Sequence, residues 1–268
     1  MRCPFCEQRT GKPDHRGSLA VSARSGNYAC FKCGTKGWEP KLAAKREKLR
    51  AEEVLLGVAT PDDPPVLEPP EGFQAFAEDV AQEALVFRAG RAYLENRGVG
   101  SHQVRLAGLG AVPGGFWGRR VIAPVLWRGK WRGWVARDWT NKAEKRYLYP
   151  RGMRRGLLLY NREALEVETD VPCLVVEGVF DALRYLPDAV ACLGKPGESH
   201  VEMLLEARRP IVVVLDGDAV DESWQLAARL RAEERATGWV RLPPESDPGD
   251  CPSGWLKMRA WECLTESL

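Results

Sequence analysis

The sequence predicts a mixed α/β protein, with a small metal-clamped β module followed by a larger part built on a parallel β-sheet. Three features carry this prediction: two CxxC pairs near the N-terminus, a proline-rich stretch behind them, and apolar strand-like runs that alternate with helical segments from Pro172 onward. Strands separated by single helices indicate a parallel sheet covered by helices. The 268 residues, 44% hydrophobic and 28% charged, fit a globular chain of about two domains.

Four cysteines form the two CxxC pairs, Cys3 with Cys6 and Cys30 with Cys33, and 23 residues separate the pairs. Each pair brings two thiolates to one point, and four sulfurs complete the tetrahedral shell of a structural zinc ion. A module of fewer than about 40 residues also needs such a staple to fold. The open alternative is a set of redox or free thiols, and His15 is a weaker ligand candidate than the four cysteines.

We therefore assign a zinc ribbon to residues 1–38. A helical and proline-rich linker should follow over 39–72, because Lys41–Leu56 is rich in helix formers and 61–72 contains five prolines, which favour an extended chain. The remaining expected segments are a small basic subdomain of mixed α/β structure (73–165), an α/β parallel-sheet domain (166–250) and a C-terminal helix (251–268).

Hydrophobic patterns place the elements within these segments. Gln74–Asn96 has a helical pattern, whereas residues 106–140 contain strand-like runs separated by glycines. The expected strands of the parallel sheet are CLVVEG (173–178), AVACLG (189–194), PIVVVLDGD (210–218) and GWVRLPP (238–244), with helices over 180–186, 198–209 and 221–236. Cys173 and Cys192 lie in these strands without metal-ligand spacing and should be buried. The tail Ser253–Leu268 should form an amphipathic helix.

Acidic residues follow three of these strands at the point where each strand ends. They are Glu177 and Asp181, Asp216 and Asp218, and Asp247 and Asp250, and we call them the acidic cluster. Because the carboxyl ends of parallel strands meet at one edge, we expect these side chains to lie close together. Carboxylate oxygens are the ligands that magnesium and manganese prefer. A single acid after a strand is more often a helix cap, but three such groups in succession indicate a metal site.

A strongly basic segment lies before the acidic cluster. Residues 119–162 contain thirteen Lys and Arg side chains against two acidic ones, although the net charge of the whole chain is only +2. Trp117, Trp127, Trp131, Trp134 and Trp139 lie in this segment or just before it. Positive charge mixed with aromatic rings favours single-stranded nucleic acid, although the charge alone also fits a solvated surface. At least two of these tryptophans should be ordinary core residues.

No apolar run approaches the roughly 20 residues that span a bilayer, so we expect no membrane association. The N-terminus MRCPFCEQRT has no apolar segment of signal-peptide length. The chain should therefore stay in the reducing cytoplasm.

These motifs together resemble the DnaG-type primase family over most of the chain. CPFC…GSLAVSA…YACFKCG is similar to the family's zinc ribbon, and GRAYLENRG is similar to the opening of its polymerase core. The strand-end acids resemble those of a Toprim domain: Glu177 takes the position of the invariant glutamate, Asp181 that of the second acid, and Asp216 with Asp218 that of the DxD motif.

The resemblance implies a DNA primase, a DNA-directed RNA polymerase and nucleotidyltransferase of DNA replication. Its catalytic residues would be Glu177, Asp181, Asp216 and Asp218, and catalytic magnesium or manganese would bind Glu177, Asp216, Asp218 and Asp247, with Asp250 less firmly implied. Arg120, Arg137, Arg146, Arg155 and Lys195 would bind nucleic acid or nucleotide. The implied partners are a single-stranded DNA template, ribonucleoside triphosphates, the RNA primer product and a replicative helicase.

The sequence departs from the family pattern at several positions. Cys6 stands where many bacterial members have histidine, Gly249 interrupts the usual DPD, and Lys195 replaces a small hydroxyl residue. The residues after 250 are too few for a helicase or a large helicase-binding domain, so we expect a form similar to compact phage or plasmid members, located in the host cytoplasm if a phage encodes it.

Two other functions share these features. A Toprim-type metal-dependent nuclease would use the same acids, and a single-stranded DNA-binding protein with a decayed site would keep only the basic segment. The intact acids disfavour the decayed site, and the ribbon followed by the primase-like middle favours synthesis over cleavage. A topoisomerase needs a nucleophilic tyrosine on a large gated domain, for which this chain has no room.

Overall fold

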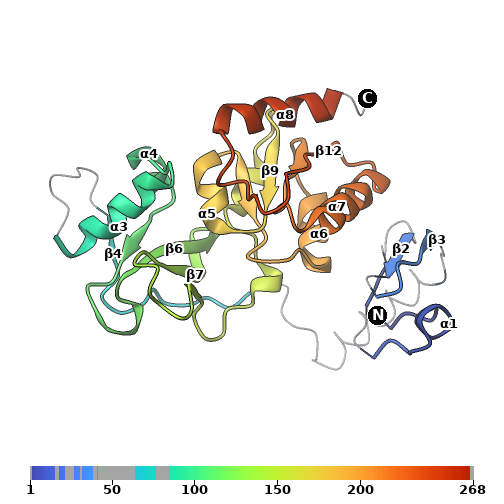
Figure 1. Cartoon of the computed structure of the whole chain (residues 1–268), viewed down its shortest axis with the longest axis horizontal. Helices are drawn as coiled ribbons and strands as arrows, with labels where there is room; N and C mark the ends of the chain where they lie inside the picture. Colours follow the sequence, from blue (N-terminus) through green and yellow to red (C-terminus); the bar gives the residue numbers. More distant parts are fainter. Residues whose placement is uncertain are drawn as a thin grey trace. The chain divides into compact units, whose positions relative to one another are not determined.

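The structure is a computed structural model that describes residues 2–15, 18–21, 27–30, 32–38, 41, 64–76 and 85–265. The chain divides into two compact units, Met1–Asp63 and Pro64–Leu268, and each is described by itself. The helix expected over Lys41–Leu56 lies, apart from Lys41, outside the described residues. Figure 1 shows the elements of both units in sequence colours.

The first unit is a small antiparallel sheet with one short helix. Strands β1 (Leu19–Val21), β2 (Asn27–Cys30) and β3 (Lys36–Trp38) pair in that order, and α1 (Cys6–Thr10) precedes them. The buried apolar residues described here are Leu19, Val21 and the cysteines Cys3, Cys6 and Cys30. Burial of these few side chains contributes little hydrophobic free energy. The unit therefore needs a further cross-link such as a metal.

The second unit begins with a five-stranded antiparallel sheet. Its strands, in the order β4-β5-β6-β7-β8, are β4 (Gln74–Ala75), β5 (Gly110–Ala111), β6 (Arg120–Trp127), β7 (Lys130–Asp138) and β8 (Tyr147–Leu148). Helices α3 (Leu85–Asn96) and α4 (Ser101–Leu106) accompany it. The β6–β7 hairpin turns at Arg128 and Gly129, both at positive φ, which matches the strand twist of a two-residue hairpin turn.

Two sequence expectations in this region need correction. The helix expected from Gln74 is described from Leu85, and Gln74–Ala75 instead forms β4. Strand β4 can pair with β5 because Gly110 has no side chain. A Cβ at this position would overlap the carbonyl oxygen of Gln74 in the neighbouring strand. The strand-like region expected from residue 106 begins inside a helix, because α4 ends at Leu106, and the first strand after it is Gly110–Ala111.

A four-stranded parallel sheet forms the rest of the second unit, as the alternating pattern predicts. Strands β9 (Cys173–Val176), β10 (Ala189–Ala191), β11 (Ile211–Val213) and β12 (Thr237–Trp239) lie in the order β10-β9-β11-β12, with parallel pairing throughout. The helices are α5 (Val179–Ala182), α6 (Glu198–Leu205), α7 (Val220–Ala232) and α8 (Ser253–Thr265). Single turns of 3₁₀ helix cover Gly115–Trp117, Arg155–Leu157, Arg162–Glu166 and Leu183–Tyr185.

Helices cover both faces of the parallel sheet because its strands are buried on both sides. Leu174 and Val176 of β9 pack with α5 and α8, whereas Cys173 and Val175 pack with α6 and α7. Figure 1 shows α8 on one side of β9 and the pair α6 and α7 on the other. Cys173 and Cys192 are buried, as expected. The hydrophobic core that contains Leu174 and Val176 also includes Val121 of β6 and Val135 of β7. The two sheets of this unit therefore share one hydrophobic core.

The described part of the proline-rich segment, residues 64–72, has no helix and no strand, as expected. It nevertheless packs on the antiparallel sheet instead of running free. The Leu67 amide donates to the Trp131 carbonyl at 2.9 Å, and Arg132 donates to the carbonyl of Pro64. Leu67 also contacts the apolar cluster on the outer face of that sheet. The prolines therefore exclude a helix or a strand in this segment, but they do not prevent it from packing on the antiparallel sheet.

Among the helices within the described ranges, none is long and apolar enough to cross a membrane.

Candidate active site and metal centre

The four cysteines of the first unit converge on one point. The Sγ atoms of Cys3 and Cys33 are 3.7 Å apart, those of Cys6 and Cys30 are 3.5 Å apart, and all four lie within 4.8 Å of one another. Four sulfurs bound tetrahedrally at about 2.3 Å from zinc would lie about 3.8 Å apart. The donor set and spacing therefore fit a closed structural zinc site, and exposed His15 is not part of it.

Asp14 holds one side of this centre, and the sequence analysis did not single it out. Its carboxylate accepts hydrogen bonds from the Cys3 amide at 2.9 Å and the Ser18 amide at 2.6 Å, and from the Ser18 hydroxyl at 3.0 Å. The buried Asp14 thus ties the first cysteine knuckle to the start of β1. An aspartate in a polar loop before a serine is a common turn residue, so its spacing alone did not point to this role.

The members of the acidic cluster follow three strands of the parallel sheet. Glu177 comes directly after β9 and Asp181 lies in α5, Asp216 and Asp218 come after β11, and Asp247 and Asp250 lie in the loop between β12 and α8. Burial and then the charges of Asp216 and Asp218 raise the pKa of Glu177 to about 7. Burial and then Asp247 and Asp216 raise the pKa of Asp181 to about 7. Burial, Asp247, Asp218 and Asp250 raise the pKa of Asp216 to about 6. These mutual effects show that the carboxyl groups lie near one another, and that nearby cations offset burial and mutual repulsion only in part.

Two observations test whether this cluster suits a hard cation. The buried Oδ1 of Asp216 has no hydrogen-bond partner, which is costly unless an ion or water meets it. A Cβ at Gly249 would lie 2.8 Å from Asp181 Oδ1 and 2.9 Å from Asp247 Oδ1, so the missing side chain leaves room between two carboxylates. Across the described ranges only the cysteines bring three ligand atoms within 4.8 Å of one another, so no three acids of the cluster converge this closely.

The loop that carries Asp247 and Asp250 is held from two sides. The Tyr185 hydroxyl donates to the Pro248 carbonyl at 2.6 Å, and Arg184 donates to the Gly249 carbonyl. The Gly217 amide, between Asp216 and Asp218, donates to the Ser246 carbonyl at 2.8 Å. Asp247 itself accepts from the Asp250 amide at 2.9 Å. Backbone contacts therefore position the third acidic pair next to the second.

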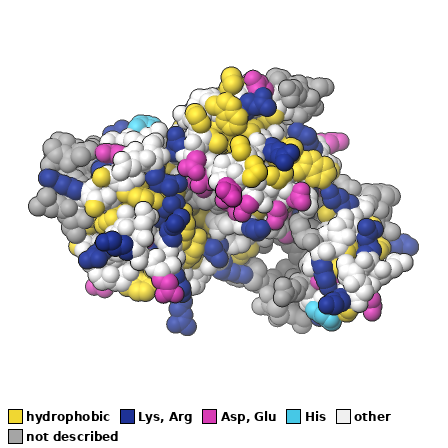
Figure 2. Space-filling view, in the orientation of Figure 1, with side chains coloured by type: hydrophobic (Ala, Val, Ile, Leu, Met, Phe, Trp, Pro, Cys, Tyr) yellow, Lys and Arg dark blue, Asp and Glu magenta, His cyan; other side chains and the backbone are white. Residues whose placement is uncertain are grey.

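Cations border the acidic cluster on the side of the antiparallel sheet. In Figure 2, Asp and Glu side chains gather near the middle of the face, and a band of Lys and Arg side chains runs beside them. Arg97, just after α3, lies 3.8 Å from Asp181. Arg137 is buried among the rings of Tyr93, Tyr147 and Phe180, at 4.9 to 5.6 Å from their centroids. Its charge opposes the effect of burial on the pKa of Asp181.

The other basic residues singled out in the sequence occupy different environments. Arg120 is only 7% exposed, and its guanidinium donates to the Lys145 carbonyl at 3.0 Å and the Arg146 carbonyl at 3.1 Å. The Arg146 side chain is exposed. Exposed Arg155 stacks on Tyr149 at 4.3 Å and donates to the Leu193 carbonyl. Arg120 therefore supports the loop that presents Arg146.

Lys195 lies on the parallel-sheet side of the acidic cluster. Its ammonium group pairs with Glu222 at 2.8 Å, and its charge opposes the rise in the pKa of Glu177 that burial causes. His200 braces this region, since its Nδ1 accepts from the Gly197 amide at 2.9 Å and its Nε2 lies 3.1 Å from the Leu158 carbonyl. Arg97, Tyr185 and His200 belong to no pattern that pointed to the site, although Arg97 lies in the GRAYLENRG stretch.

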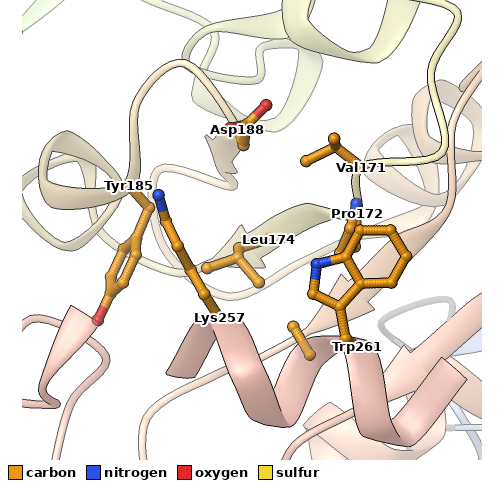
Figure 3. A pocket seen from close by; sticks show the side chains of 8 residues that line it. Val171, Pro172, Leu174, Tyr185, Asp188, Lys257 and Trp261 are labelled. Atoms are coloured by element: carbon orange, nitrogen blue, oxygen red, sulfur yellow. The ribbon is translucent and has the colours of Figure 1, made fainter. Parts of the chain in front are cut away.

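A small cavity lies elsewhere on the second unit. Figure 3 shows its lining, in which Leu174 of β9 and Tyr185 face Lys257 and Trp261 of α8. None of its lining residues belongs to the acidic cluster. Its one carboxylate, Asp188, pairs with Arg209 at 2.6 Å. The cavity is therefore a packing gap under α8 and no part of the candidate active site.

Comparison with protein-family models and with curated proteins finds no match. Solved structures do match. The zinc-binding and RNA polymerase domains of Aquifex aeolicus primase are 20% identical with a TM-score of 0.57, and the alignment covers 99% of this chain and 78% of that one. The Escherichia coli primase catalytic core is 22% identical with a TM-score of 0.53, covering 69% and 74%.

A third similar structure is a DnaG primase catalytic domain bound to single-stranded DNA, 22% identical with a TM-score of 0.57, covering 84% of this chain and 80% of that one. The two units thus define a protein with an N-terminal four-cysteine centre and an α/β core in which a cluster of acids follows the strands of the parallel sheet. Its fold is that of the DnaG primases, as the motif resemblance predicted.

Proposed function

We propose that this protein is a DNA primase that starts short RNA chains on a single-stranded DNA template. The observation that carries the proposal is the acidic cluster, with its raised pKa values and its border of cations, on a fold shared with primase catalytic cores. Nucleotidyl transfer needs divalent ions to screen phosphate charge and positive side chains to hold the triphosphate. The cluster and its border supply both kinds of group.

In this proposal the parallel-sheet part acts as a Toprim domain. Glu177, Asp216, Asp218 and Asp247 would hold magnesium or manganese, with Asp250 at the edge of the set. When bound, the ions would lower the pKa of a primer 3′ hydroxyl and neutralise the charge that leaves with pyrophosphate. Asp181 is the most buried of the acids with raised pKa, and Arg97 beside it would hold its carboxylate in place.

The basic residues would hold phosphates. Arg146 and Arg155 are exposed, and Lys195 is close enough to Glu177 for its charge to affect that carboxyl group. A triphosphate whose phosphates reach these cations would present its α-phosphorus to the acidic cluster, and positioning of this kind supplies much of the acceleration in phosphoryl transfer. Arg137 would act from beneath by keeping Tyr147 and Phe180 packed beside Asp181.

The first unit would act as a zinc ribbon that contacts template. One similar catalytic domain has been solved with single-stranded DNA, and the RNA polymerase domain of Mycobacterium tuberculosis primase, 20% identical with a TM-score of 0.54, with double-stranded DNA. The template and the RNA product both carry phosphates and bases, so the same cationic and aromatic side chains would suit either strand. A replicative helicase would supply the single strand.

Incubation of the full chain with single-stranded DNA, labelled ribonucleoside triphosphates and magnesium or manganese tests the proposal. We expect RNA products of a few nucleotides and an intact template, and Asp216→Asn should abolish synthesis while template binding persists. Shortened template without RNA products would identify a nuclease instead. Binding without either reaction, at normal metal content, would identify a single-stranded DNA-binding protein.

A further inference from the structure

Phe116 is the most exposed of the large apolar side chains that the structure describes, at 73%. It lies in the 3₁₀ turn Gly115–Trp117 that leads into β6. Gly115 has a φ of +74°, a conformation that residues with a Cβ rarely adopt, so the loop is built to turn tightly at this point. A single exposed apolar residue is unremarkable in general, so its surroundings decide whether it has a role.

Aromatic packing fixes Phe116 from below. Its ring lies 4.9 Å from that of Trp117, edge to face, and Trp117 lies 5.2 Å from the buried Trp134 of β7. Trp134 in turn contacts Trp131 at 6.2 Å. The exposed ring therefore stands at the end of a row of aromatic side chains that is rooted in the core of the antiparallel sheet.

Positive charge surrounds the loop. Arg119 follows Phe116 closely, and its carbonyl accepts from the Trp139 amide at 3.2 Å. The buried Arg120 binds the carbonyls of Lys145 and Arg146, which brings the loop after β7 to the same end of the sheet. The exposed charged residues of these two loops are the acid Glu144 and four cations. We call the four cations the basic rim: Arg119, Lys142, Lys145 and Arg146.

The basic rim continues toward the acidic cluster. Burial raises the pKa of Tyr93, and the charges of Arg137, Arg97 and Arg146 oppose that rise, so these three cations lie near one phenol. Arg97 and Arg137 act in the same way on Asp181. Cations therefore lie between the proposed catalytic acids and the loop after β7 that carries Arg146, and Arg120 ties this loop to the start of β6, just after the turn that carries Phe116.

We propose that Phe116 is a stacking platform for a base of the single-stranded template, whose phosphates lie on the basic rim. Single-strand sites combine cations along the backbone with aromatic rings that stack on exposed base faces. A duplex offers no free base face at such a tip, and a second copy of this chain would bring a second basic rim against the first. The inference rests on the proposed function and names a template contact within it.

Affinity of the full chain for two labelled strands of equal length, oligo-dT and an abasic backbone, tests this contact. Phe116→Ala should weaken binding to oligo-dT by on the order of tenfold and leave binding to the abasic strand unchanged. Phe116→Trp should restore the affinity, and the slope of log affinity against log salt should stay constant because no phosphate contact is lost. Met258→Ala is the matched control, since Met258 is also exposed, at 52%, but lies on α8.

Equal affinities of wild type and Phe116→Ala for oligo-dT would overturn the inference. An equal loss of affinity for oligo-dT and for the abasic strand would also overturn it. So would a wild type that binds both strands equally well. A change in oligomeric state without a change in DNA affinity would overturn it in favour of self-association. Primer synthesis is measured separately. A base-specific loss at Phe116 in a chain that makes no RNA would refute the primase activity and leave the platform standing.

Discussion

Arg97 lies 3.8 Å from the carboxylate of Asp181, and this ion pair joins the end of α3 to the first acid-bearing helix of the parallel sheet. The distance is long for a direct hydrogen bond, so the pair only partly offsets the burial of Asp181. Burial and the nearby Asp247 and Asp216 still raise the pKa of Asp181 to about 7. The antiparallel and parallel sheets of the second unit thus meet at a carboxyl group whose pKa is raised toward neutrality.

This relationship predicts a pH-dependent stability. Because the folded pKa of about 7 exceeds the ordinary value of 3.8, the folded state keeps a proton between those values that the unfolded state has lost. The contribution of Asp181 to stability is therefore full below pH 4 and is lost as pH rises to 7. A pKa difference of one corresponds to about 1.4 kcal/mol, so Asp181→Asn should stabilise the metal-free protein by a few kcal/mol at pH 8.

Thermal unfolding with a chelator, at pH 4 and at pH 8, measures this effect. The variant should melt several degrees above wild type at pH 8 and close to it at pH 4. Magnesium should raise the melting temperature of wild type more than that of the variant, since ions bind the charged cluster. A variant less stable than wild type at pH 8 would show that Asp181 is charged and well paired.

Gly217 should be essential for the geometry of the acidic cluster. A Cβ at this position would overlap the carbonyl oxygen of Pro243 and lie 2.8 Å from its carbonyl carbon. Gly217→Ala should push apart the loops that carry Asp216 and Asp247, and we expect at least a tenfold loss of primer synthesis with template binding retained. Gly254→Ala is the control, because its Cβ would have no neighbour within 4 Å. Equal activity of the two variants would show that the loops adapt.

Phosphate contacts should appear in the salt dependence of template binding. Each contact with a single strand contributes about 0.7 to the negative slope of log affinity against log salt. Replacement of the exposed Arg146 and Arg155 by alanine should flatten the slope by about 1.4 in total and weaken binding. Arg208→Ala, on an exposed residue after α6, should leave the slope unchanged. An unaltered slope in the double variant would place the template elsewhere.

Loss of zinc should separate initiation from extension. We expect one zinc ion per chain, and replacement of Cys30 and Cys33 by serine should release it and unfold the first unit alone, because that unit has few other buried contacts. Such a variant should fail to start on bare template yet extend a pre-annealed RNA. A shortened chain that begins at Pro64 should behave alike. The truncation must not extend beyond Pro64, because the second unit begins there and the Leu67 amide binds the Trp131 carbonyl of the antiparallel sheet. Metal analysis and start-site mapping check both results.

Local sequence was sufficient for the metal centre and for the parallel sheet. Two CxxC pairs bring their sulfurs together through short knuckles, so their spacing alone determined the four-cysteine site. Apolar strands that alternate with helices can bury themselves only as a parallel sheet, and its carboxyl edge collects the acids that follow each strand. The placement of these acids after successive parallel strands therefore followed from local sequence, even though they span more than seventy residues.

Contacts between distant segments were decided by tertiary structure alone. Nothing near Arg120 in the sequence shows that its guanidinium is buried against the carbonyls of Lys145 and Arg146, and nothing near Phe116 shows that Trp134 anchors its neighbour. The proline-rich segment looked free because its composition excludes regular structure, yet Leu67 finds a place on the sheet. Sequence patterns report the periodicity of one element, whereas these contacts depend on which surfaces remain uncovered after the sheets have packed.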